Sequence, residues 1–80
     1  MGIKRAIVLR IERLCKDRKI KLNALANISG VTPSTVYSMF DNERNDVGVT
    51  TLKKICDGLE ISITDFFDDD IFKNLEQEIK

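Results

Sequence analysis

The stretch that decides the fold runs over residues 22–39 and reads LNALANISGVTPSTVYSM. Apolar residues recur at helical spacing along its first third, and this pattern stops at Gly30. Glycine adopts the left-handed backbone conformation that ends a helix without steric cost. Thr32 and Pro33 then indicate a new helix start, because threonine caps free N–H groups and a proline in the first turn has no N–H to leave unpaired. The stretch therefore predicts two short helices joined by a sharp turn.

The apolar residues around that turn predict how the two helices pack. The first helix covers about residues 22–29, and its small Ala26 allows close approach of a second helix. The second helix runs from Pro33 to about Phe40, with Val36, Met39 and Phe40 on its buried face. This combination is the steric arrangement of a helix-turn-helix, whose second helix enters the DNA major groove. Lys21 is a weak cap for the first helix, and Asn23 is the alternative cap if that helix begins later.

The rest of the chain also has helical periodicity. Further helices are predicted over Lys4–Arg18, over Val49–Gly58 and after a capping box that begins at Ser62, with a polar loop over residues 41–48. The expected inward-facing residues are Ile7, Ile11, Leu14 and Cys15 in the first of these helices, and Val49, Leu52, Ile55 and Cys56 in the second. Residues 71–80 are compatible with an extension of the last helix, a separate turn or a frayed end. The predicted fold class is all-α: a five-helix domain over residues 1–70 with a short C-terminal extension over residues 71–80.

Composition argues against an enzyme. Eighty residues bury only a small core, which leaves little room for a deep catalytic cavity. The chain has no histidine, no phosphate-binding glycine loop and no paired carboxylates with an evident pocket. The two cysteines, Cys15 and Cys56, are far apart and are expected to be buried core residues rather than metal ligands. We therefore expect no metal, no cofactor and no catalytic residue.

Charge is distributed unevenly along a chain whose net charge is zero. Residues 1–56 contain eleven Lys and Arg against five Asp and Glu, whereas residues 57–80 contain two against eight. A basic body with an acidic tail is typical of proteins that bind a polyanion. The longest clean apolar run, Ala6–Leu9, is far too short for a membrane span, and no secretion signal is evident near Met1. A cytoplasmic protein without a membrane partner is expected.

At this point the sequence resembles a known family. Residues 25–37 (LANISGVTPSTVY) are similar to the helix-turn-helix of phage-repressor/Cro-like (XRE-type) transcriptional regulators, and residues 51–59 and 61–67 resemble that family's fourth and fifth helices. The resemblance implies a five-helix domain, operator DNA as ligand and commonly a homodimer. Two departures stand out. Leu22 occupies the place of a phosphate-bonding glutamine, and Glu60 that of the glycine after the fourth helix.

Candidate DNA contacts lie on the second helix of the motif and around it. Serine and threonine bond several base edges or a phosphate, and the tyrosine ring packs on a thymine methyl while its hydroxyl reaches a phosphate. The predicted DNA-binding residues are Lys21, Asn23, Thr32, Pro33, Ser34, Thr35, Tyr37, Ser38, Arg44 and Asn45. The second helix carries no lysine or arginine, so we expect modest base discrimination from it.

The acidic and aromatic C-terminal region leaves two explanations open. The residues Phe66, Phe67, Ile71 and Phe72 either pack on a two-fold partner or close the core of one chain. The acidic run Asp65–Asp70 is expected to face away from DNA. The leading functional prediction is a sequence-specific DNA-binding regulator, a repressor or autoregulator. The alternative is a protein-interaction module, such as an antitoxin or adaptor, that retains the fold and binds a protein partner through this region.

Overall fold

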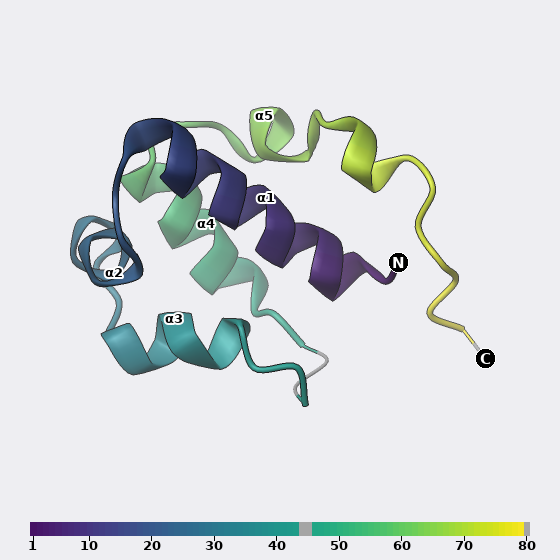
Figure 1. Cartoon of the computed structure of the whole chain (residues 1–80), viewed down its shortest axis with the longest axis horizontal. Coiled ribbons are helices and arrows are strands. Elements are labelled where there is room, and N and C mark those ends of the chain that lie inside the picture. The colour runs from purple at the N-terminus through teal and green to yellow at the C-terminus, as the bar shows by residue number, and fades with distance from the viewer. Residues whose placement is uncertain (44–45, 80) are drawn as a thin grey trace.

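The computed structural model describes residues 1–43 and 46–79, and within these ranges it is helical without strands. Its elements are α1 (Ile3–Arg18), α2 (Leu22–Ser29), α3 (Pro33–Met39), α4 (Val49–Gly58), α5 (Ile63–Phe67) and a 3-10 turn, η1 (Asp70–Phe72). In Figure 1, α1 and α4 cross the middle of the molecule, α3 lies along one edge, α5 and η1 lie along the opposite edge, and the last residues run down the side of the molecule past the N-terminus. The predicted all-α, five-helix architecture is confirmed.

A single core joins the five helices. Its largest fully buried side chains are Phe66, Ile11, Leu25, Ile55, Leu59 and Val36. Ala26 and Cys56 are also fully buried, and Cys15 is nearly so. Burial raises the pKa of both thiols, so each is a neutral, small apolar group at pH 7, as predicted.

Three of the helices end in the same way. After α1, α2 and α4 the chain enters the left-handed region at Lys19 (φ 56°), Gly30 (φ 69°) and Glu60 (φ 58°). In each case the next backbone N–H donates back to the carbonyl five residues earlier, for example from Val31 to Ala26 at 3.1 Å. This is the Schellman arrangement, which satisfies the last carbonyls of a helix. Only the turn at Gly30 has the residue that this conformation favours.

Glu60→Gly should therefore stabilise the protein. A side chain in the left-handed conformation costs about 1–2 kcal/mol, and the extra flexibility of an unfolded glycine offsets part of the gain. We expect a free energy of unfolding about 1 kcal/mol higher in urea titrations followed by circular dichroism. The control is Glu12→Gly, which removes the same charge from the exposed side of α1 and should lower stability by a similar amount. A loss of stability in both variants would contradict this interpretation of Glu60.

One local prediction is wrong. Val49 was expected to be buried but is 80% exposed, because it is the first residue of α4 and the helix first turns into the core at Leu52. Of the two N-cap positions left open for α2, Asn23 is not the one used. The cap position is Lys21, which makes no side-chain capping bond, and Asn23 lies inside the first turn.

The C-terminal region packs onto α1. Arg10 donates to the carbonyls of Phe66 (2.8 Å) and Asp65 (3.0 Å). Asp69 forms ion pairs with Arg10 (3.5 Å) and Arg13 (3.6 Å). The rings of Phe66, Phe67 and Phe72 form a cluster with centroids 4.8–6.0 Å apart. Of the two explanations left open for the aromatic residues, the structure favours closure of the chain's own core, since Phe66 is fully buried and its two neighbours are half-buried.

Candidate nucleic-acid interface

The start of α3 is held by its capping threonine. The Thr32 hydroxyl accepts a bond from the backbone N–H of Thr35 at 3.3 Å, and Pro33 occupies the first turn. The same hydroxyl lies 2.9 Å from the Thr35 hydroxyl and 3.1 Å from that of Ser34. Three neighbouring hydroxyl groups therefore converge at the N-terminus of α3, where a helix presents its free N–H groups and partial positive charge.

The side chains of α3 form a buried face and an exposed face. Val36 and Met39 are buried against the core, as the sequence predicts, whereas Phe40, also expected on this face, is only half-buried because it lies at the C-cap of α3. Thr32, Pro33 and Ser34 are exposed, and Tyr37 is 53% exposed on the same short helix. Thr35 and Ser38 are half-buried. The exposed surface of α3 is thus mostly polar, and its one large group is the Tyr37 ring.

Tyr37 is tied to α2 by a hydrogen bond across the turn. Its hydroxyl donates to Oδ1 of Asn23 at 3.2 Å, and both side chains are exposed. The bond joins the first turn of α2 to the outer surface of α3, so these two candidate residues form one polar unit. No sequence pattern predicts this pair, because the partners are fourteen residues apart and belong to different helices.

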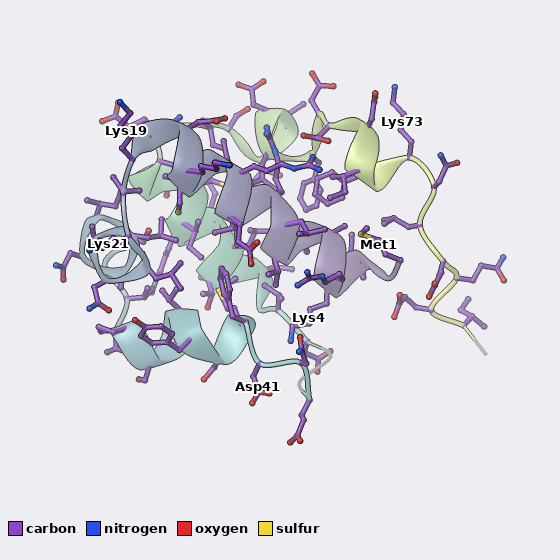
Figure 2. All side chains as sticks on the ribbon, viewed as in Figure 1. Met1, Lys4, Lys19, Lys21, Asp41 and Lys73 are labelled. Carbon is purple, nitrogen blue, oxygen red and sulfur yellow. The ribbon has the colours of Figure 1, made fainter. Side chains whose placement is uncertain are left out.

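Cations approach this surface from two sides. Lys21 is exposed at the N-terminus of α2, and Figure 2 shows it beside that helix. Lys4 of α1 reaches the segment after α3 and donates to the carbonyl of Asp41; Figure 2 shows the two side by side. Lys4 is not among the residues predicted from sequence, since a contact across thirty-seven residues leaves no local signal. The predicted contacts Arg44 and Asn45 lie outside the described residues.

A close approach between α2 and α4 sets the position of the motif. A Cβ placed on Gly58 would lie 2.6 Å from the Ser29 hydroxyl oxygen and 2.9 Å from the Ile28 carbonyl oxygen. Those distances are below ordinary van der Waals contact, so only glycine fits at this crossing. The Ser29 hydroxyl is buried there without a hydrogen-bond partner among the described residues.

The acidic surface lies away from α3. The residues Asp65, Asp68 and Asp70 are exposed on α5 and the turn after it, across the molecule from α3 in Figure 1. Asp69 is instead half-buried by its two arginine partners. The four acids therefore do not surround the polar surface of α2 and α3, and a polyanion at that surface meets less repulsion.

The comparisons with known proteins agree with this geometry. A family profile for Cro/C1-type helix-turn-helix DNA-binding domains matches residues 10–70. The chain belongs to this family. The fold is also similar to that in the crystal structure of the prophage Lp1 protein 11, with a TM-score of 0.82 and 28% sequence identity. The similarity covers 94% of this chain and 100% of that one. The comparison with curated proteins gives no match.

Membership of the Cro/C1-type family identifies the chain as a DNA-binding regulator and not an enzyme. The two short helices joined at Gly30, α2 and α3, lie within the matched residues. Among the described residues, no helix has both the length and the apolar character that crossing a bilayer requires.

Proposed function

We propose that this Cro/C1-type protein binds double-stranded operator DNA in a sequence-specific manner, with α3 in the major groove, and acts as a repressor or autoregulator. The observation that carries the proposal is the outer surface of α3, where the exposed Ser34 and Tyr37 stand opposite the buried Val36. A helix that enters the major groove reads base edges with side chains of this kind. We therefore expect the protein to act on DNA in the cytoplasm.

Phosphate contacts are assigned to the groups around α3. Lys21 and Asn23 at the start of α2 and the hydroxyl cluster at Thr32 supply donors, and the sequence adds Arg44 and Asn45 as candidates. Such contacts set the register of the protein on the duplex, whereas base contacts select the sequence. The short α3 has no cationic side chain, which is why we propose that affinity depends on its surroundings.

The function is tested by selecting bound duplexes from a random pool and by measuring affinity for the selected sequence against a scrambled one. The proposal requires a preferred sequence that is bound more tightly than the scrambled duplex at the same salt concentration. Equal affinity for the two duplexes would contradict it.

Lys21→Gln should weaken binding to every duplex. Loss of one phosphate contact lowers the slope of log affinity against log salt concentration by about one. The matched control is Lys73→Gln on the opposite side of the molecule, which Figure 2 shows beside the C-terminal segment. Fluorescence anisotropy titrations at several salt concentrations check both variants. If Lys73→Gln changes the slope as much as Lys21→Gln, the proposed orientation on DNA is wrong.

A homodimer is proposed as the binding species, because two copies double the readout and fix the spacing of half-sites. The alternative function, a protein-interaction module acting through the C-terminal aromatic residues, is less favoured, since Phe66 and Asp69 already pack against α1 within the chain. The homodimer is tested by sedimentation analysis with and without the selected duplex, which measures the number of chains bound per duplex. Two chains per duplex support the homodimer, and one chain per duplex contradicts it.

A further inference from the structure

The hydrogen bond between Tyr37 and Asn23 has a consequence for how DNA is read. A tyrosine hydroxyl has one proton to donate and two lone pairs that accept. Here the hydroxyl donates its proton to Oδ1 of Asn23, which lies 3.2 Å from the phenolic oxygen. The exposed phenolic oxygen therefore faces solvent only as an acceptor.

An acceptor cannot bond a phosphate, which itself only accepts. In the major groove, the groups that donate are the amino groups of adenine and cytosine, whereas guanine O6 and thymine O4 accept. Tyr37, 53% exposed on the outer surface of α3, is the large side chain there that is placed to meet a base edge.

Asn23 has the opposite role. Its Oδ1 is occupied by the tyrosine, so its exposed amide presents two N–H donors on Nδ2. These donors stand at the first turn of α2, beside Lys21, where a phosphate is their natural acceptor.

We propose that Asn23 and Tyr37 act as a coupled reader, in which Asn23 binds a DNA phosphate and holds the Tyr37 proton, so that the Tyr37 oxygen accepts from the amino group of an adenine or cytosine. Asn23 is thereby a positioning residue for base selection as well as a phosphate contact. The inference rests on the proposed function.

Three variants separate base selection by Tyr37 from phosphate binding by Asn23. Tyr37→Phe removes the acceptor and should reduce the preference at one operator position by about three- to tenfold, because the lost bond is made only with the preferred base. Asn23→Asp keeps an acceptor for the tyrosine proton but loses the amide donors. It should weaken binding to all duplexes while the base preference is kept. Asn23→Ala frees the hydroxyl to donate to guanine or thymine as well, so it should lose both affinity and preference.

The experiment is selection from a random duplex pool, followed by anisotropy titrations with the four base pairs at the position in question. Asn74→Asp in the exposed C-terminal segment is the control for the added negative charge and should behave as the unmodified protein. The inference is overturned if Tyr37→Phe weakens all duplexes equally, if it leaves the preference intact, or if Asn23→Asp loses the preference as Asn23→Ala does. An unmodified protein that prefers no duplex would instead overturn the proposed function itself.

Discussion

Phe66→Ala should lower the free energy of unfolding by about 3–5 kcal/mol, the largest effect expected of any single change considered for this chain. The Phe66 ring is fully buried and contacts the rings of Phe67 and Phe72. Its backbone carbonyl also accepts a hydrogen bond from Nε of Arg10. The guanidinium carbon of Arg10 lies 5.9 Å from the centroid of the Phe66 ring. Removal of the ring leaves a cavity where α5 and the C-terminal turn pack against α1.

Urea titrations followed by circular dichroism measure this loss. Tyr37→Ala is the matched control, because it removes an aromatic ring that is half exposed on α3 and should cost far less. Equal destabilisation by the two variants would contradict the packing of α5 in this structure. A loss of that size is a large fraction of the stability of a domain this small, so partial unfolding at 37 °C is also expected.

Gly58→Ala should lower stability by about 1–3 kcal/mol, in spite of the gain in helix propensity. The new Cβ meets the Ser29 hydroxyl oxygen at 2.6 Å and the Ile28 carbonyl oxygen at 2.9 Å, and the second of these is backbone. Relief therefore requires α2 to move away from α4. Since α2 carries Asn23 and leads into α3, we expect DNA affinity to fall as well.

Two controls separate the clash from other effects of alanine. Gly48→Ala places a Cβ 3.5 Å from its nearest neighbour, an ordinary contact, and should cost less than about 1 kcal/mol. Ser29→Ala alone removes a buried hydroxyl that has no partner among the described residues, and should stabilise the protein by about 1 kcal/mol. In the Gly58→Ala background the same change should stabilise the protein by more than it does alone, because it also relieves the close contact. An equal gain in both backgrounds would show that the contact with Ser29 does not cause the loss.

The helix-turn-helix could be predicted from sequence because its signals are local. The turn glycine, the capping threonine and the proline after it each act through their own backbone conformation. The burial of Val36 and Met39 follows from helical spacing alone. Val49 shows the limit of that method, since periodicity marks a face of a helix but does not show at which residue the face first meets the core.

The contacts that assemble the site could not be predicted. Arg10 and Arg13 are two of several cations on α1, and nothing in the sequence selects Asp69 as their shared partner. The Tyr37–Asn23 bond depends on how α2 packs against α3, and the close approach at Gly58 depends on how α2 packs against α4. These contacts arise only once the helices have packed together.

The surface that meets DNA is measured most directly by the change in backbone amide chemical shifts when the selected duplex is added to isotopically labelled protein. The largest changes should fall on residues 32–38 and on the first turn of α2, with α5 and residues 70–79 little affected. Changes concentrated on α5 and the C-terminal segment, with α3 unaltered, would contradict the proposed use of this helix.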